Sequence, residues 1–503
     1  MNQTPKSAQE RAVELANEAL RAEAQGAQPQ ALALHREALA LAPQLSAIRF
    51  NLANALCATG EPLALLEAQQ HYLQVLQQDP THLGAWNNLG TVLFDSGHLS
   101  AAQTAFTAAT TYHPTHGGVR LNLAQVLLHK NEVVLAQEQF QQLLQQDPDL
   151  PAAHQGLAAC ASRRGDETLA AYHRERGFSP APLQVWPGQG PGPRSRLLIL
   201  GSAQEGNIPW RFLIDHRRFD CTSIALEYWD ERLPLPPHDL CFNAIGDADR
   251  CRNVLEKAAL LPRSNPWINV PELVLRTGRF TLGQQLASLA GVRVPRMAWL
   301  ESHSDWSASL RSLQAQALDF PLLIRSVGYH GGQFFERVSQ VAQLPDILAQ
   351  LPGSRWLALE YLETRDSAGR FRKFRMMCID GVLYPIHLAV ASQWKVHYFS
   401  ADLQQDVAAR AEESRFLQNP EEYLGSRVMQ ALQTLATRIG LDYFGIDFGV
   451  NDQAEVLLFE ANATMVLHPP TDDPQWDYRR PAVQRAIEAT RTLFARRARI
   501  EAG

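Results

Sequence analysis

Cysteine is scarce in this 503-residue chain, which contains six cysteines and no CxxC pair. That number and spacing predict neither a disulfide framework nor a zinc site, because both need cysteines grouped at short intervals. The sequence also lacks an apolar run long enough to span a bilayer. Its first residues, MNQTPKSAQERAVE, have no apolar segment of the kind found in a secretory signal. We therefore expect a protein of the reducing cytoplasm with no membrane partner.

An excess of positive charge is missing too. The formal net charge is -6, and residues 1–150 hold 7 Lys and Arg against 13 Asp and Glu, which accounts for all of it. Binding of nucleic acid needs clustered cations, so no nucleic-acid partner is expected. The length is too great for one hydrophobic core, which predicts two or three domains.

The first part of the chain repeats itself with a regular period. Large and small side chains recur in one order, and a proline closes each unit. One unit has Trp86, Leu89, Gly90, Leu93, Ala102, Phe106, Ala109 and Pro114, and the next has Arg120, Leu123, Ala124, Leu127, Ala136, Phe140, Leu143 and Pro148. Small residues let two helices approach, large ones fill the space between pairs, and the proline ends the second helix.

This order and this period resemble the tetratricopeptide-repeat (TPR) family over residues 8–178. The resemblance implies an all-α superhelix whose concave groove holds a peptide or protein segment. Several asparagines on the expected first helices could line that groove, namely Asn51, Asn54, Asn87, Asn88 and Asn122. Their amides could bind the main chain of a peptide, or they could be solvated surface positions, and the sequence favours neither interpretation.

The composition changes after residue 178. Residues 179–195 are rich in proline and glycine, which predicts a semi-rigid domain linker. Expected strands at 197–202, 223–229 and 239–247 and a helix at about 249–261 then predict a small doubly wound α/β domain over 196–275. A second helix is expected at 281–290. Further strands are expected at 321–326, 355–362, 374–390, 443–450 and 455–462. The Asp380-Gly381 pair suits a type I′ hairpin turn.

Two carboxylates and an amide near the C-terminus form a candidate metal site. Asp447 lies in one apolar strand, and Glu460 and Asn462 lie in the next, on one face because strand side chains alternate. If the two strands are antiparallel neighbours, the three side chains can form a cluster of oxygen ligands of the kind that Mg²⁺ prefers. The alternative is a pair of carboxylates neutralised by nearby arginines.

These residues also carry a family resemblance. The segments DYFGIDFGV and VLLFEANATM resemble the closing metal motif of the ATP-grasp superfamily, in which an Asp is followed by Glu-x-Asn. Glutathione synthetase and the D-alanine–D-alanine ligases are members. The resemblance covers about residues 196–500 and implies a pre-ATP-grasp domain at 196–275, then an α/β (α+β) ATP-grasp catalytic domain at 276–500. By this resemblance, Asp447, Glu460 and Asn462 would hold two Mg²⁺ ions that bridge the phosphates of ATP.

Three further segments follow in the order expected for that superfamily. FPLLIRSVGYHGGQ resembles its phosphate loop, which assigns phosphate contacts to Gly328, His330, Gly331 and Gly332. Arg325 stands where the family usually has a lysine that reaches the phosphates, and Arg279 stands at an earlier lysine position. The run LALEYLE resembles the hinge that binds adenine and ribose, through Glu360, Tyr361 and Leu362.

The segment RFRKFRM places three cations on one strand. Alternation puts Lys373 and Arg375 on one face and Arg372 on the other. We expect Lys373 and Arg375 to offset the charge of the transferred phosphoryl group, with Arg375 replacing an arginine that many ligases carry near the metal aspartate. His387, Trp394, Lys395 and His397 follow and could shape the pocket for the acceptor.

The resemblance implies an ATP- and Mg-dependent ligase that activates a carboxylate as an acyl phosphate and joins it to an amine. Arg325, Lys373 and Arg375 would stabilise the charge, and no covalent protein nucleophile is needed. The repeats could hold a peptide or protein substrate, or could recruit a partner enzyme. Two other functions stay open. One is a TPR scaffold with a degenerate nucleotide site, and the other is an ATP-grasp phosphotransferase.

Overall fold

The computed structural model describes residues 7–188, 193–301, 307–329, 332–366, 368–396, 403, 405–467, 469–470 and 473–499. His330, Gly331 and His397 therefore lie outside the described residues. The chain divides into two compact units. The first comprises Met1–Ile199, Arg211–Leu240 and Thr471–Asp473, and the second comprises Leu200–Trp210, Cys241–Pro470 and Pro474–Gly503.

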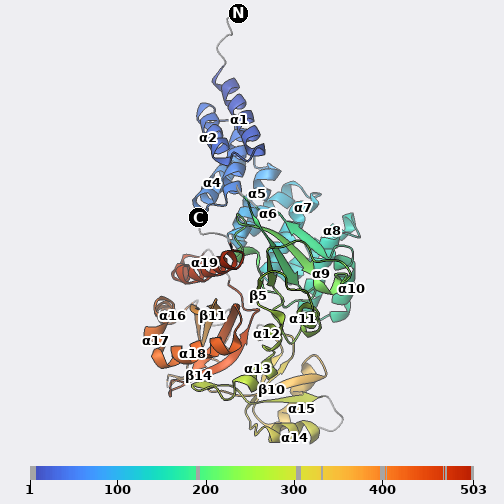
Figure 1. Cartoon of the computed structure of the whole chain (residues 1–503), viewed down its shortest axis with the longest axis vertical. Helices are drawn as coiled ribbons and strands as arrows, with labels where there is room; N and C mark the ends of the chain where they lie inside the picture. The colour runs from blue at the N-terminus through green and yellow to red at the C-terminus, as the bar shows by residue number, and fades with distance from the viewer. Residues whose placement is uncertain are drawn as a thin grey trace, which may run out of the picture. The chain divides into compact units, whose positions relative to one another are not determined.

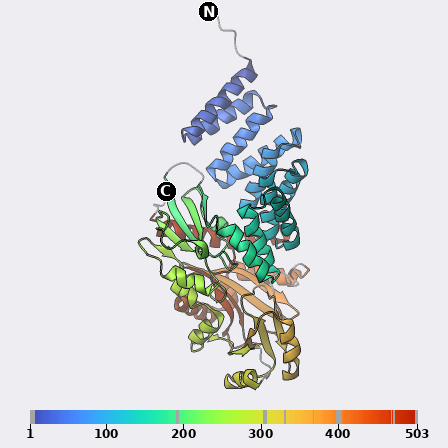
Figure 2. The same ribbon diagram turned by 90° about the vertical axis from the view of Figure 1, so that its right-hand side faces the viewer.

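The first unit begins with a series of paired helices, which are visible in Figures 1 and 2. The helices are α1 (Ala8–Ala24), α2 (Gln28–Leu41), α3 (Ser46–Thr59), α4 (Pro62–Gln78), α5 (Leu83–Asp95), α6 (Leu99–Tyr112), α7 (Gly117–His129), α8 (Val133–Gln146), α9 (Pro151–Arg163) and α10 (Glu167–Phe178). Each odd-numbered helix packs against the even-numbered helix that follows and against the even-numbered helix before it. The predicted extent of the repeats, 8–178, agrees with these bounds.

The repeat period has a structural counterpart at the start of each repeat. A side chain on the first helix of a pair contacts the carbonyl oxygen of a proline shortly before it, which the end of the preceding helix leaves without a helical partner. The four contacts are Arg49 to Pro43 at 2.8 Å, Trp86 to Pro80 at 2.8 Å, Arg120 to Pro114 at 2.5 Å and His154 to Pro148 at 3.0 Å. Different residue types at one register position thus fulfil one role.

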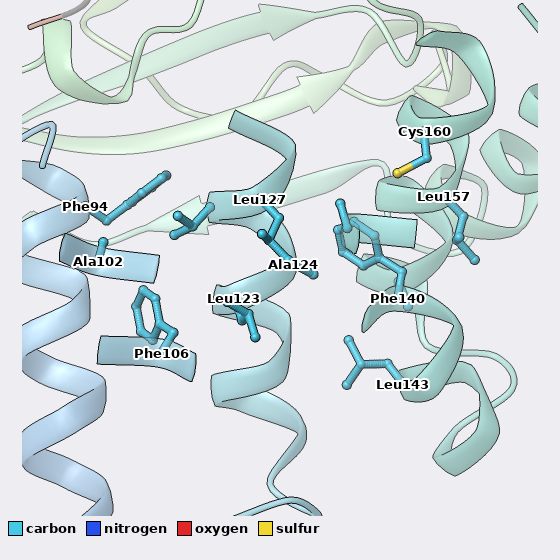
Figure 3. Packing of buried hydrophobic residues seen from close by; sticks show 13 residues of the cluster. Phe94, Ala102, Phe106, Leu123, Ala124, Leu127, Phe140, Leu143, Leu157 and Cys160 are labelled. Atoms are coloured by element: carbon cyan, nitrogen blue, oxygen red, sulfur yellow. The ribbon is translucent and has the colours of Figure 1, made fainter. Parts of the chain in front are cut away.

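Large aromatic rings fill the space between neighbouring helix pairs (Figure 3). Phe106 and Phe140, which occupy the same position in successive repeats, are 2% and 1% exposed and belong to one apolar cluster. Gly156 on α9 makes room for the ring of Phe140, because a Cβ at Gly156 would lie 2.1 Å from its Cζ atom. Burying such a ring contributes about 1.5–3 kcal/mol to folding, so these positions explain why the repeat pattern is periodic.

Strands follow the last helix of the first unit. β1 (Leu183–Trp186) pairs antiparallel with β3 (Phe219–Ala225), with Trp186 opposite Cys221. The segment 179–195 that we interpreted as a linker thus contains a strand. Its residues LQVW are of the apolar and aromatic kind that pair well on a sheet. β2 (Ser195–Gly201) and β4 (Leu240–Asn243) each contain residues of both units.

The second unit contains a short βαβ element. β4 is followed by α11 (Arg252–Ala259), and β5 (Trp267–Ile268) pairs parallel with β4. Two further helices, α12 (Pro271–Leu275) and α13 (Arg279–Leu286), lead away from it. This parallel pair agrees with the predicted α/β character, and α13 begins slightly before the helix that we expected at 281–290.

A four-stranded antiparallel sheet comes next, in the order β7-β10-β8-β9. Its strands are β7 (Met297–Glu301), β8 (Leu322–Ser326), β9 (Phe335–Val338) and β10 (Arg355–Glu360). The helices α14 (Ser307–Ala315) and α15 (Leu344–Gln350) contribute Leu313, Leu344 and Leu348 to the apolar core on this sheet.

The third sheet has the order β12-β11-β13-β14-β6. Its strands are β6 (Val292–Arg293), β11 (Phe371–Ile379), β12 (Val382–Ala391), β13 (Tyr443–Val450) and β14 (Val456–Asn462). At the turn between β11 and β12, Asp380 and Gly381 have φ of 54° and 79°, which confirms the left-handed conformation expected for a type I′ turn.

Four helices accompany this sheet along the chain, namely α16 (Val407–Gln418), α17 (Pro420–Leu424), α18 (Ser426–Ile439) and α19 (Arg480–Arg497). Phe374 on β11 packs against Phe416 of α16 and stacks on Phe448 of β13, so aromatic contacts join α16 to this sheet. Across the described part of the chain, no helix combines the length and apolar character needed to cross a membrane.

Candidate functional site

Four charged or titratable residues face one another across the third sheet. His387 on β12 lies opposite Arg375 on β11, Arg375 lies opposite Asp447 on β13, and Asp447 lies opposite Glu460 on β14. The pairing confirms that β13 and β14 are antiparallel neighbours, as the metal-site prediction required. A register shift next to Asp447 adds one residue to β14, so Phe459 is the bulged residue beside Glu460.

Asp447 is buried and already has two cationic partners. Its side chain is 1% exposed, and its carboxylate accepts bonds from Arg375 at 2.6 and 2.8 Å and lies 2.6 Å from Nζ of Lys373. Burial acts to raise the pKa of Asp447, but Arg375 and Lys373 outweigh it and hold that pKa well below its usual value. The carboxylate therefore stays ionised.

The split of the three cations on β11 is confirmed. Lys373 and Arg375 reach Asp447, whereas Arg372 on the opposite face pairs with Asp366 and with Glu412 of α16. Arg372 is thus a structural residue that ties α16 to the sheet, and the other two remain at the predicted site.

Glu460 and Asn462 lie together on one face of β14, as predicted. Nδ2 of Asn462 donates to Oε1 of Glu460 at 2.6 Å, and Arg279 at the start of α13 forms an ion pair with the same oxygen. Arg279 also donates to the carbonyl oxygen of Phe459 at 2.9 Å. The amide oxygen of Asn462 accepts from the backbone and the hydroxyl of Thr464 at 3.0 and 2.8 Å.

These residues border a cavity of the second unit with about 780 Å³ of space, counting its open mouth. Five predicted site residues line it, namely Arg279, Arg325, Gly328, Glu460 and Asn462. The structure thus brings the predicted phosphate-binding arginines and two of the three predicted metal ligands to one cavity.

Arg325 is the cation on β8 at this cavity. Burial, followed by the neighbouring Arg279, lowers the pKa of Arg325 to about 10, so the guanidinium keeps its charge at neutral pH. It donates to the carbonyl oxygen of Tyr329 and lies 5.9 Å from the ring centre of Phe335. Arg325 and Arg279 thus bring two positive charges to a cavity that the carboxylates of Glu460, Asp249 and Asp247 also line.

The loop after β8 has the backbone freedom that a phosphate loop needs. Gly328 and Gly332 have φ of 83° and 75°, in the left-handed region where glycine is preferred. The carbonyl oxygen of Gly328 accepts from Arg250 at 3.3 Å. Gly332 is the first described residue after His330 and Gly331, and a Cβ at Gly332 would lie 3.4 Å from Cε of Lys395.

The predicted adenine hinge has a different neighbourhood from the one we expected. Glu360, at the end of β10, accepts hydrogen bonds from Arg293 at 2.8 Å and from Arg296 at 3.1 Å. These bonds link β10 to the end of β6 and to the segment between β6 and β7. Burial acts to raise the pKa of Glu360, but Arg296 and Arg293 lower it overall. The ring of Tyr361 lies 4.4 Å from the guanidinium of Arg337.

Apolar residues nearby line the cavity instead of Glu360, Tyr361 and Leu362. They are Phe280, Leu282, Val294, Met297, Trp299, Leu357 and Leu359. Two of them, Leu357 and Leu359, belong to the LALEYLE run itself. Side chains of a strand alternate between its two faces, so β10 lines the cavity with these two leucines. A flat apolar ring fits such a wall.

Sequence reasoning missed a cavity-lining loop that lies much earlier in the chain, directly after β4. Asp247, Ala248 and Asp249, which follow β4, line the cavity. Asp247 is 6% exposed and accepts from the backbone of Asp249 and of Arg250 at 2.9 and 3.0 Å. The signal was available, because polar residues beyond the carboxyl end of a strand in a parallel α/β unit are frequent ligand contacts.

Asp249 connects this loop to the arginine at α13. Its carboxylate accepts from the backbone N–H of Arg279 at 3.1 Å, and burial raises the pKa of Asp249. Gly246 and Gly278 permit the close approach. A Cβ at Gly246 would lie 2.9 Å from the backbone nitrogen of Thr464, and one at Gly278 would lie 2.8 Å from Oδ1 of Asp249.

The described part of the chain contains no group of three or more His, Cys, Asp or Glu side chains placed to hold a metal ion. At the predicted site, Lys373 and Arg375 engage both oxygens of Asp447, Arg279 engages Oε1 of Glu460, and Thr464 donates to the amide oxygen of Asn462. The carboxylates are thus paired with cations, and the binding of a metal ion at these residues stays a prediction.

Asparagines of the first unit form a ladder from repeat to repeat. Asn88 donates to Oδ1 of Asn54 at 2.9 Å, Asn87 donates to Asn88 at 3.1 Å, and Asn122 donates to Asn87 at 3.0 Å. Tyr72 also donates to Asn54 at 2.7 Å. Four of the five predicted asparagines are thus half-buried and bonded to one another, and their contact with a peptide stays a prediction.

Comparison with known proteins finds similarities to the first, helical part of the chain. The family model described as Tetratricopeptide repeat matches residues 93–160. MamA from Desulfovibrio magneticus RS-1 is a similar solved structure, with 21% identity over 33% of this chain and 93% of that chain and a TM-score of 0.31. YrrB, described as a TPR protein with an unusual peptide-binding site, has 18% identity over 34% of this chain and 87% of that chain and a TM-score of 0.31.

No curated protein matches the chain. The matched segment and the regular helix pairs together show that the part of the chain from α1 to α10 carries TPR repeats. The region after them is a mixed α/β fold with several sheets.

Proposed function

We propose that the second unit is an ATP- and Mg-dependent carboxylate–amine ligase and that the TPR repeats bind a peptide or protein. The observation that supports this most directly is the cavity where Arg279 and Arg325 meet Glu460 and Asn462 beside an apolar wall. A nucleoside triphosphate needs these three kinds of surface. Its base is flat and mostly apolar, its phosphates are anionic, and its metal ion takes oxygen ligands.

The residues present fit that ligand. Arg279, Arg325 and the backbone at Gly328 would hold the phosphates, and Glu460, Asn462 and Asp447 would hold Mg²⁺. When bound, the metal ion would offset the phosphate charge during transfer. Trp299 and Phe280, which lie 5.6 Å apart at the cavity wall, would contact the base. Lys373 and Arg375 stand one strand away from the metal ligands and would stabilise the transferred phosphoryl group.

The reaction balances without a covalent protein intermediate. An oxygen of the substrate carboxylate attacks the γ-phosphorus, the bond to the β-phosphate oxygen breaks, and ADP leaves. The resulting acyl phosphate is attacked at its carbonyl carbon by an amine, so that a C–N bond forms and phosphate leaves. The chain's contribution is to place and neutralise charge, which suits a site rich in arginine, lysine and carboxylate side chains.

The repeats would supply the substrate or a partner. A TPR array is a protein-interaction module, and the asparagine ladder gives its first helices a row of amides that can exchange their mutual bonds for bonds to a peptide. A peptide or protein substrate explains why a ligase carries such an array, and recruitment of a second enzyme explains it equally well.

Nucleotide binding is the first test. The full chain is titrated with the non-hydrolysable analogue AMPPNP and MgCl₂ while its melting temperature is followed, because a ligand of the folded form raises that temperature. Arg325→Met should abolish the shift, and Arg438→Met, which removes an exposed arginine on α18, should leave it unchanged. If the unaltered protein shows no shift at millimolar analogue, the TPR scaffold with a degenerate site is the better function. Arg279 and Arg325 stand where the ATP-grasp superfamily usually has lysines, and this difference favours the scaffold function.

The type of transfer is tested separately. The protein is incubated with Mg-ATP, hydroxylamine and pools of amino acids or peptides, since hydroxylamine converts an acyl phosphate into a stable hydroxamate. A hydroxamate that forms together with ADP supports the ligase. A stable phosphorylated product without hydroxamate would instead identify a phosphotransferase.

A further inference from the structure

The cations and carboxylates of the second unit's site are paired with each other. Glu460 is paired with Arg279, and Asp447 is paired with Lys373 and Arg375. Under the proposed function, the two acids are metal ligands and the three cations serve phosphate or phosphoryl groups. Each carboxylate that would bind a metal ion is thus paired with a cation that would bind a phosphate.

The contacts are direct and leave no room for a metal ion between the partners. Both carboxylate oxygens of Asp447 are engaged, at 2.6 Å by Lys373 and at 2.6 and 2.8 Å by Arg375. The Oε1 atom of Glu460 is shared by Arg279 and Asn462. A divalent cation placed here would lie beside the positive charges of these partners, and at such distances like charges repel by several kcal/mol.

The pairs are also able to separate. Lys373 and Arg375 have side chains that are 19% and 24% exposed, and Arg279 is 15% exposed at the cavity wall. Of the three cations, Arg279 lines the cavity. The long aliphatic stems of all three allow the charged groups to move while their backbones stay in place. Arg279 keeps an anchor during such a movement, because its backbone N–H donates to Asp249.

We propose that Arg279, Lys373 and Arg375 act as internal counter-ions that exclude free divalent cations from Glu460 and Asp447 until a polyphosphate draws them away. Metal and polyphosphate then bind as one unit, each removing the obstacle to the other. This inference rests on the proposed nucleotide site but concerns how its charges are exchanged. This exchange explains why the carboxylate oxygens of Glu460 and Asp447 are bonded to cationic side chains.

The test uses the full chain and Mn²⁺, whose binding is followed by electron paramagnetic resonance. With MnCl₂ alone the unaltered protein should show no binding, and tripolyphosphate or AMPPNP should strengthen Mn²⁺ binding at least about tenfold, the factor that corresponds to about 1.4 kcal/mol. In Arg279→Gln, MnCl₂ alone should bind at least about tenfold more tightly than to the unaltered protein, for the same reason.

Three comparison variants make the result specific. Arg279→Lys keeps a positive charge and should keep Mn²⁺ excluded. Arg279→Gln/Glu460→Gln should lose the gained binding. Arg263→Gln removes the partner of an ordinary carboxylate, Glu272, by the same substitution and should gain nothing. Lys373→Gln/Arg375→Gln, which removes both cations from Asp447, provides an independent route to the same effect, should Arg279→Gln fail to fold as judged by circular dichroism.

Two results would overturn the inference. One is binding of Mn²⁺ alone to the unaltered protein as tight as in the presence of tripolyphosphate. The other is no gain of Mn²⁺ binding in either Arg279→Gln or Lys373→Gln/Arg375→Gln. Failure of the proposed function is a different result, in which AMPPNP binds no variant although Arg279→Gln gains Mn²⁺ binding by itself.

Discussion

Replacing Asp447 by asparagine should be among the most damaging single changes in the second unit. The substitution keeps the shape of the side chain and removes its negative charge. Lys373 and Arg375 would then face a neutral amide at 2.6 Å, inside a sheet where Asp447 is 1% exposed. Removing one partner of a buried ion pair costs about 3–5 kcal/mol, because the remaining charge is left uncompensated. Since both cations are partly exposed, we expect the lower end, about 3 kcal/mol.

The assay follows the opening of β13 in the full chain. Urea unfolding is monitored by hydrogen exchange of peptides that contain residues 443–450, so that the result refers to this sheet and not to the repeats. Asp380→Asn is the matched control. Asp380 pairs with Arg496 on the surface, where the two side chains are 39% and 59% exposed. Exposed pairs contribute about 0.2–1 kcal/mol, and asparagine tolerates the positive φ of 54° at this turn.

The effect should also depend on pH in a defined direction. Because the pKa of Asp447 is lower in the folded protein than its ordinary value of 3.8, the carboxylate stabilises the fold fully above pH 3.8 and less as the pH falls below it. Each pH unit below 3.8 removes about 1.4 kcal/mol, so the difference between the unaltered protein and Asp447→Asn should narrow by about 1 kcal/mol from pH 5 to pH 3. Equal effects of Asp447→Asn and Asp380→Asn at pH 7 would refute the reasoning, as would a difference that stays constant with pH.

Three predictions concern the repeats and are measured by thermal or urea unfolding at the helical circular-dichroism signal. Gly156→Ala should destabilise the array by about 1–3 kcal/mol, because the new Cβ would lie 2.1 Å from the ring of Phe140. Gly117→Ala, whose nearest side-chain atom would lie at 3.5 Å, is its control and should be neutral or stabilising by up to about 1 kcal/mol. Phe140→Ala should cost about 3–5 kcal/mol, since the ring is 1% exposed. Finally, burial and then His154, whose Nδ1 lies 2.8 Å from Nδ1 of His173, lower the pKa of His173 below 6.5. Its stabilising contribution is full above pH 6.5 and is lost as the pH falls, so His173→Gln should reduce the loss of stability between pH 7.5 and pH 5.5, and an unchanged pH dependence would contradict this.

Much of the fold could be predicted from local pattern. The repeated order of large and small residues predicted the extent of the helical array, because packing between neighbouring helices recurs with the same period. The strands at Tyr443–Val450 and Val456–Asn462 were predictable because each is an apolar run and a short turn makes them neighbours. The linker at 179–195 was predicted from proline and glycine content, which does not reveal that Leu183–Trp186 finds a partner strand.

The site could be predicted only in part. Arg279, Arg325, Gly328, Glu460 and Asn462 do meet at one cavity. Glu360 was expected there from its place in LALEYLE, but the arginines at 293 and 296 bind it, and no local pattern shows such pairs. The loop with Asp247 and Asp249 was not singled out, because it approaches Asn462–Thr464 only through packing between segments that are far apart in the sequence.

The sequence by itself determined the helical repeats and the strand alternation that separates Arg372 from Lys373 and Arg375. These depend on the periods of helix and strand and on short connections, which neighbouring residues specify. Only the tertiary structure decided that the acids and the cations are held by each other and that a distant loop completes the cavity. Ion pairs across a sheet depend on which strands become neighbours and how far each charge is buried, and both are set by the packing of the whole unit.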